Sequence, residues 1–245
     1  EFRAAHSQRL RLERYHDAIA ALASRNLAYA CACSRAEARR AAGTDAAVYP
    51  GTCRDRGLGL EDDPAGTVLR FRMPAAREGV LSARDESGGA FALHPGRDMG
   101  DFVLRRRGGD PAYQVASVMD DVAHGVDFVV RGLDLMPSTG AQLALARALE
   151  LPEFARIRFW HHELIRDDAG EKLSKSRGAE SLAALRARFP DPAPLFRWFA
   201  SALGRDPASA ARVSTAHDLL EGFDPARVPA TPLRLSDFWR YVDGG

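Results

Sequence analysis

Lysine is almost absent from this chain of 245 residues. All but two of its 34 basic residues are arginine, and the two lysines, Lys172 and Lys175, lie together in the segment "EKLSKSR" (171–177). Arginine usage on this scale is typical of a genome-wide compositional bias. A lysine kept against such a bias is informative, so this segment is a candidate functional loop.

Long apolar runs are lacking as well. No stretch of the sequence approaches the ~20 apolar residues that a helix needs to cross a bilayer, so no membrane span is predicted. The first residues, "EFRAAHSQRLRLER", are charged and do not form a secretory signal. They open without Met, in what reads as the middle of a helix. We therefore expect that the chain begins inside a longer reading frame.

The chain has few cysteines and a small net charge. Three cysteines without export features indicate a reducing, cytoplasmic compartment, where thiols bind metal rather than form disulfides. The formal net charge is only +1, so local arginine groups would have to hold any nucleic acid. The candidate groups, for which an ordinary solvated surface is the alternative, are Arg35/Arg39/Arg40, Arg54/Arg56 and Arg105/Arg106/Arg107.

The first part of the chain alternates between helix and strand patterns. Apolar residues three and four apart predict a helix from Ser7 to Arg25, with Asn26 as its C-terminal cap. The stretch "LAYACAC" alternates like a strand, and Ser34 with Glu37 predicts the capping box of a short helix that ends at Gly43. Two further strands are expected at 66–74 and 101–107, with glycine-containing turns between them.

The stretch 113–165 reads as strand, strand, helix and strand. The expected strands are "YQVASVM", "VDFVVRG" and "IRFWHHELI", and Ser138 or Thr139 is expected to cap the helix, with Gln142 completing a capping box. A helix between two strands predicts a βαβ unit with parallel strands buried on both faces. The rest of the chain is expected to be helical, with Phe196, Trp198 and Phe199 in the core rather than in a base-stacking platform.

The side chains of the lysine segment are suited to binding phosphate. A lysine is a compact charge on a flexible stem, which suits a phosphate that moves during reaction. A solvated surface loop is the alternative, but it does not explain why both lysines of the chain lie there. "KLSKS" (172–176) resembles the KMSKS-type loop of class I aminoacyl-tRNA synthetases, which closes over ATP. This resemblance implies that Lys172 and Lys175 are catalytic and that Lys175 binds ATP.

A second resemblance concerns residues 112–142, "AYQVASVMDDVAHGVDFVVRGLDLMPSTGAQ". They are similar to the glutamyl-tRNA synthetase group, which implies that Tyr113 and Arg131 bind L-glutamate. Independently, Arg131 lies at the carboxyl end of a predicted parallel strand, which is where open α/β sheets bind ligands. Its guanidinium group suits a carboxylate. The alternatives are a core position for Tyr113 and a salt bridge between Arg131 and Asp134.

The cysteines form a candidate metal site with Tyr49. An extended 31–33 segment places Cys31 and Cys33 on one face, and Cys53 adds a third sulfur. Three sulfurs leave one of the four coordination positions of a tetrahedral zinc open. Tyr49 would have to lose a proton with a free pKa of ~10, which a nearby Zn²⁺ could cause. The alternatives are His94 or water as the fourth ligand, or cysteines without metal. The Cys-x-Cys…Tyr-x-x-x-Cys pattern resembles the structural zinc site of the glutamyl-queuosine tRNA(Asp) synthetases, short paralogues of glutamyl-tRNA synthetase.

The resemblance implies an α/β chain with the class I aminoacyl-tRNA synthetase nucleotide-binding (Rossmann-like) fold. It lacks the His-Ile-Gly-His-like motif and the first half of that fold, so we expect an N-terminally truncated form. The expected segments are a remnant helix (1–25), a zinc-bearing acceptor-side insertion (26–110), the second Rossmann half (111–165) and the KLSKS loop with a helical tail (166–245). Glu163 replaces a proline usual in the family, which argues against an adenine contact for His161.

The function implied by the resemblance is activation of L-glutamate with ATP and Mg²⁺, and its transfer to the queuosine base in the anticodon of tRNA(Asp). The chain is expected to act as a monomer, away from membranes. Three alternatives remain open. They are a glutamyl-tRNA synthetase core that charges tRNA(Glu), a non-catalytic zinc module that binds RNA through its arginines, and a chain that is inactive without the first half of the fold.

Overall fold

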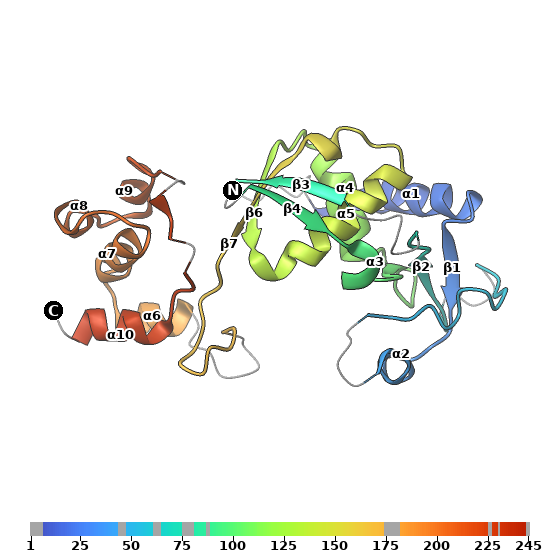
Figure 1. Cartoon of the computed structure of the whole chain (residues 1–245), viewed down its shortest axis with the longest axis horizontal. Helices are drawn as coiled ribbons and strands as arrows, with labels where there is room; N and C mark the ends of the chain where they lie inside the picture. Colours follow the sequence, from blue (N-terminus) through green and yellow to red (C-terminus); the bar gives the residue numbers. More distant parts are fainter. Residues whose placement is uncertain are drawn as a thin grey trace. The chain divides into compact units, whose positions relative to one another are not determined.

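The computed structural model describes residues 7–43, 48–60, 65–74, 81–86, 89–173, 182–224, 227–229 and 231–243 (Figure 1). Contacts divide the chain into two compact units. The first comprises Glu1–Asp85, Gly89–Val129 and Leu135–Phe159, and the second Glu86–Gly88, Val130–Asp134 and Trp160–Gly245. The boundary between them passes through two strands, β6 (Phe128–Gly132) and β7 (Arg158–His162).

The first unit begins with the expected helix. A 3-10 turn, η2 (Gln8–Arg11), leads into α1 (Leu12–Ser24), which buries Tyr15, Ile19 and Leu22. Asn26 follows the helix with a left-handed φ of 56°, a conformation that asparagine tolerates better than most residues. The predicted helix and its C-terminal cap are therefore confirmed.

A three-stranded antiparallel sheet carries the cysteine region (Figure 1). Its strands are β1 (Ala28–Cys31), β2 (Val68–Phe71) and β5 (Val103–Arg105), in the order β1-β2-β5. Helix α2 (Arg35–Ala42) follows β1, and its start has the predicted capping box between Ser34 and Glu37. Gly43 ends the helix at a φ of 83°, as expected. The predicted strands β1, β2 and β5 and the predicted helix α2 are therefore confirmed.

A second sheet has the order β4-β3-β7-β6. Its hairpin, β3 (Leu81–Asp85) with β4 (Gly89–Leu93), was not expected from the sequence; β3 also pairs in parallel with β7 through Asp85 and Phe159. A short helix, α3 (Pro95–Asp98), follows β4. Strand β6 lies at the edge of this sheet and its Val130 is 55% exposed, so the prediction of strands buried on both faces is wrong for β6.

Two further expectations for this region are wrong. "YQVASVM" is the start of a helix, α4 (Tyr113–Ala123), and not a strand. Helix α5 (Met136–Ala148) begins before Ser138 and Thr139, which are buried inside it together with Gln142 and cap nothing. Short 3-10 turns, η3 (Leu133–Leu135) and η4 (Phe154–Arg156), flank α5. The order of β6, α5 and β7 is the predicted strand, helix and strand.

The core of the first unit joins α1, α4, α5 and the strands. Its fully buried large side chains are Tyr15, Leu22, Phe71, Leu104, Val115, Val118, Leu145, Phe154 and Phe159. A hydrogen-bonded carboxylate ties two of these helices together, because Asp120 on α4 accepts from Arg11 and from the Tyr15 hydroxyl of α1. The cysteine-bearing sheet therefore packs against the well-packed core of the first unit.

The second unit is mainly helical beyond residue 181. It contains α6 (Leu182–Arg188), α7 (Ala193–Ala202), α8 (Pro207–Ala211), α9 (Ala216–Leu220) and α10 (Leu235–Asp243). Trp198 is 6% exposed and packs against Phe199 and Phe238, which confirms its expected core position. Among the helices described in either unit, none has the length and apolar character needed to cross a membrane.

Candidate functional site

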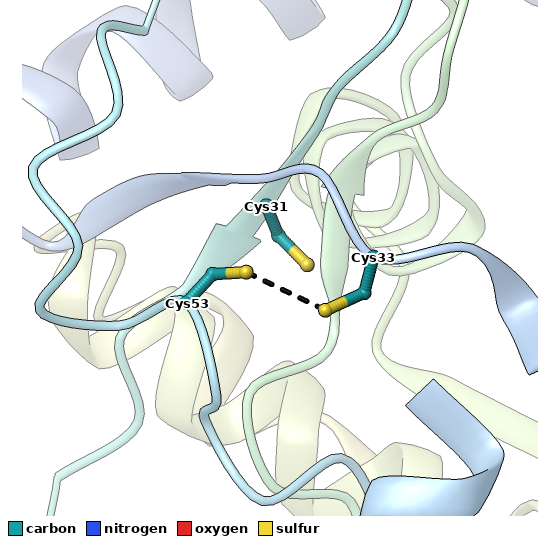
Figure 2. Close-up of side chains that lie close together, drawn as sticks. All are labelled: Cys31, Cys33 and Cys53. Carbon is teal, nitrogen blue, oxygen red and sulfur yellow. Dashed lines mark hydrogen bonds between the residues drawn. The ribbon is translucent and has the colours of Figure 1, made fainter. Parts of the chain in front are cut away.

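Three cysteine sulfurs meet at the end of strand β1. Cys31 is the last residue of β1, Cys33 lies just before α2, and Cys53 comes from a turn that follows. All three Sγ atoms lie within 4.8 Å of one another, and those of Cys33 and Cys53 are 3.4 Å apart (Figure 2). The predicted grouping of the cysteines is present in the fold.

The hydroxyl of Tyr49 lies against the same sulfurs. Its oxygen is 3.3 Å from Sγ of Cys31 and 3.6 Å from Sγ of Cys33, and it accepts the backbone N–H of Cys53 at 2.9 Å. Ligands around a tetrahedral zinc with Zn–S bonds of ~2.3 Å are separated by roughly 3.8 Å or slightly less. Three sulfurs and one oxygen at these separations fit such an ion.

The ionisation of these groups reflects their burial. Burial and hydrogen bonds with the cysteines raise the pKa of the Tyr49 hydroxyl, so it is a neutral phenol in the metal-free protein. Burial also raises the pKa of the Cys33 thiol. Burial would raise the pKa of Cys53 too, but hydrogen bonds from Tyr49, Cys33, the backbone of Ala32 and Arg56 lower it to about 6. A thiolate at Cys53 would give a cation its first ligand.

His94 is not part of this group. It immediately precedes α3, and among the described residues the side chains that could jointly hold an ion are the three cysteines. Tyr49 is therefore better placed than His94 to complete the site.

The arginines around the cysteines are not a simple solvated face. Arg54 pairs with the buried carboxylate of Asp101, and Arg105 is itself buried. Arg107 donates to the carbonyl oxygens of Ala32 and Cys33. Arg56 donates to Sγ of Cys53 at 3.8 Å. Sequence reasoning grouped these residues as candidate nucleic-acid contacts and missed that Arg56 and Arg107 contact the cysteine segment. The proximity of Arg56 to Cys53 in the chain was the available signal.

In the second unit, Arg131 is held by a neighbouring strand. Arg131 near the end of β6 is 9% exposed, and its Nε donates to Nε2 of His161 on β7 at 3.3 Å. His161 is 3% exposed, and this hydrogen bond requires an unprotonated Nε2. The sequence analysis considered His161 only for an adenine contact, against which Glu163 argued, so its contact with Arg131 was missed.

The start of the lysine loop contacts the segment after Arg131. The ammonium group of Lys172 forms an ion pair with the carboxylate of Asp134. Gly132 makes room for that carboxylate, because a Cβ there would lie 2.6 Å from Oδ1 of Asp134 and 2.9 Å from Cδ2 of Leu164. Lys175 lies outside the described residues, so its predicted role stays a prediction.

Tyr113 is the first residue of α4 in the first unit. Its side chain is 55% exposed, which rules out the alternative that it is a core tyrosine. Arg131 belongs to the second unit. A ring at the N-terminal end of a helix, open to solvent, is available to contact a small ligand.

The sequence matches a known family over most of its length. The family described as "tRNA synthetases class I (E and Q), catalytic domain" matches residues 4–232. A protein named glutamyl-Q tRNA(Asp) synthetase from Pseudomonas aeruginosa (strain LESB58) is 37% identical over 222 residues, which are 89% of this chain and 70% of that protein. A protein of the same name from Rhodobacter capsulatus is 38% identical over 202 residues, which are 76% of this chain and 72% of that protein.

Solved structures agree with this match at the level of the fold. The crystal structure of a glutamate tRNA ligase from Elizabethkingia meningosepticum, in complex with its amino acid, superposes with a TM-score of 0.70 at 21% identity. The superposition covers 98% of this chain and 54% of that one. The chain thus spans about half the length of this ligase and a larger share of the glutamyl-Q relatives.

Proposed function

We propose that this chain, which belongs to the class I tRNA synthetases of the glutamate and glutamine group, activates L-glutamate with ATP and transfers it to the queuosine base of tRNA(Asp). The observation that carries the proposal is the identity of 37% and 38% with two proteins named glutamyl-Q tRNA(Asp) synthetase. A cytoplasmic location, where ATP and tRNA meet, is part of the proposal.

The reaction has two steps. A carboxylate oxygen of glutamate attacks the α-phosphorus of ATP, so that an anhydride forms and pyrophosphate leaves; Mg²⁺, when bound to the phosphates, would offset part of their charge. A nucleophile on the queuosine base then attacks the activated carbonyl, and AMP leaves. The first step concentrates negative charge on the phosphates, and the second requires the glutamyl group to be held in one orientation.

The residues proposed for these tasks differ in chemistry. Arg131 binds a carboxylate of glutamate with its planar guanidinium group, whose orientation is fixed by the hydrogen bond from Nε to His161. The exposed ring of Tyr113 contacts the same substrate. Lys175, helped by Lys172, stabilises the charge on the phosphates. The ion pair between Lys172 and Asp134 supports this assignment, because it links the lysine loop to the segment that carries Arg131.

Zinc is proposed as a structural ion held by Cys31, Cys33, Tyr49 and Cys53. With four protein ligands it has no open position for chemistry and cross-links the segment 31–53 instead. The separations of the three sulfurs and of the phenol oxygen support this set.

A charging assay tests the function. The protein is incubated with labelled glutamate, ATP and either queuosine-containing tRNA(Asp), the same tRNA without queuosine, or tRNA(Glu). We expect label only on the queuosine-containing tRNA(Asp). Label on tRNA(Glu) alone would overturn the proposal in favour of the glutamyl-tRNA synthetase alternative. RNA binding with no glutamate-dependent pyrophosphate exchange would instead favour a non-catalytic RNA-binding module.

A further inference from the structure

We infer that two arginines, Arg70 and Arg56, neutralise the excess negative charge of the metal centre, and that Arg70 also holds Tyr49 in place as its fourth ligand. No sequence pattern singled out Arg70. The inference rests on the zinc site proposed above and assigns it a second layer of residues.

Arg70 lies directly on the ring of Tyr49. It belongs to strand β2, and its guanidinium carbon is 3.7 Å from the centroid of the Tyr49 ring. Its Nη1 donates to the backbone oxygen of Asp101 at 2.8 Å. Because β2 pairs with both β1 and β5, this side chain projects from the middle of the sheet that carries Cys31.

Arg70 is a buried cation that forms no ion pair with the carboxylates of the described residues. It is 9% exposed, and in the part of the chain that the structure describes no carboxylate lies within ion-pair distance of it and its Nε donates no hydrogen bond. Two nearby arginines differ, since Arg54 pairs with Asp101 and Arg72 with Asp55. A buried charge is costly unless an opposite charge compensates it. The group in contact with Arg70 that can supply this charge is Tyr49.

The charges of the loaded site then balance. Three thiolates and one phenolate around a dication leave an excess of two negative charges. Two guanidinium groups contact these ligands. Arg56 donates to Sγ of Cys53 at 3.8 Å, and Arg70 covers the ring of Tyr49. A cation over an aromatic ring is attracted to its π-electrons, and more strongly when the ring carries a negative charge.

Arg70 is also fixed well enough to position a ligand. The residue that accepts its hydrogen bond, Asp101, is buried, and its carboxylate accepts from the Tyr29 hydroxyl at 2.6 Å and from the Met73 N–H at 2.9 Å. Arg70 therefore presses the Tyr49 ring from an anchored position while the Cys53 N–H holds the oxygen. Both contacts keep that oxygen beside the sulfurs.

The test measures zinc affinity of the whole chain by competition with a chromophoric chelator. Arg70→Gln should weaken zinc binding ~10- to 100-fold, the usual effect of removing a residue that supports a metal ligand. Arg158→Gln is the control, because the guanidinium carbon of Arg158 lies 5.0 Å from the centroid of the Phe128 ring, which is not a ligand, and its loss should leave the affinity unchanged. Arg70→Lys keeps the charge and should recover part of the loss.

A double-mutant cycle with Tyr49→Phe separates positioning from general packing. If Arg70 acts through Tyr49, Arg70→Gln should cost little further affinity once the phenol oxygen is gone. The exposed Arg56 provides a variant that does not disturb the core, and Arg56→Gln should weaken binding ~3- to 10-fold. Wild-type affinity in both arginine variants, or an equal loss from Arg70→Gln with and without the Tyr49 oxygen, would overturn the inference. A wild-type chain that takes up no zinc would instead overturn the zinc site itself.

Discussion

Arg131 and His161 lie on neighbouring strands and are joined by a buried hydrogen bond from Nε to Nε2 at 3.3 Å. The bond fixes the plane of the guanidinium group. If Arg131 binds glutamate as proposed, His161 acts on the substrate through Arg131.

Replacing His161 should therefore affect glutamate and not ATP. His161→Leu removes the acceptor, and the loss of a hydrogen bond to a charged group costs ~1.5–3 kcal/mol, or roughly a 10- to 150-fold rise in KM for glutamate. His161→Gln keeps an acceptor oxygen and should recover much of this loss. Steady-state pyrophosphate exchange measures both KM values. A rise in KM for ATP with an unchanged KM for glutamate would show an adenine contact instead.

Catalysis by the lysine loop should depend on the geometry of the charged group at position 175 as well as on its charge. Lys175→Ala should lower the rate of glutamate-dependent pyrophosphate exchange about 100- to 1000-fold, since one preorganised donor to a charged transition state is worth ~3–4 kcal/mol. Lys175→Arg should also be impaired, because a rigid fork cannot follow a moving phosphate. Zinc content should stay normal in both. Exchange at the wild-type rate in Lys175→Ala would end this assignment.

Gly132 should tolerate no side chain. In Gly132→Ala the new Cβ would lie 2.6 Å from the Asp134 carboxylate that pairs with Lys172, and 2.9 Å from Leu164. Overpacking of this kind costs ~1–3 kcal/mol of the free energy of unfolding. Gly140→Ala is the control, since its Cβ would meet no atom closer than 3.4 Å. Urea unfolding followed by circular dichroism compares the two, and equal stability of both variants would contradict the packing argument.

Acid should loosen the second unit through Asp218. Hydrogen bonds from the backbone and hydroxyl of Ser214 and from Thr215 lower the pKa of Asp218 from 3.8 to about 2. A lowered pKa means that the stabilisation is complete above pH 3.8 and is lost as the pH falls through about 2. Wild type should thus be more stable than Asp218→Asn above pH 4, and the difference should shrink towards pH 2.

Tryptophan fluorescence can follow this titration selectively, because all three tryptophans, Trp160, Trp198 and Trp239, belong to the second unit. A difference between wild type and Asp218→Asn that stays constant across this pH range would rule out the capping carboxylate as its source.

The sequence predicted the first part of the fold well because local signals dominate there. The stripe of Tyr15, Ile19 and Leu22 and the capping box of Ser34 and Glu37 depend only on neighbours in the chain. The two cysteines of "CAC" were correctly grouped with Cys53 and Tyr49. What could not be read from spacing was the layer of arginines behind them, because strand pairing brings Arg70 to Tyr49 from a distant part of the chain.

The errors in the rest of the fold have separate physical causes. In "YQVASVM" the β-branched valines suggested a strand, yet Val115 and Val118 are three apart and share a buried helix face. For α5, polar Ser138 and Thr139 suggested a cap, whereas Pro137 in the first turn marks the true start. In α4, burial by the surrounding core outweighed the strand preference of the valines, whereas in α5 the proline signal was overlooked. The β3–β4 hairpin was missed because its strands are short and neither "LSARD" nor "GAFAL" carries a β-branched residue.

The chain has two lysines, and one of them, Lys172, forms an ion pair with Asp134, so its reactions with amine reagents are unusually simple. Apart from the terminal amino group, a reagent that acylates primary amines can react at only two side chains, both in the segment 171–177. One of them is engaged by a carboxylate, which slows its acylation as long as the pair is intact. A fluorophore introduced by simple amine labelling would therefore report on this segment without any engineered cysteine, and its rate of attachment would follow the breaking of the pair.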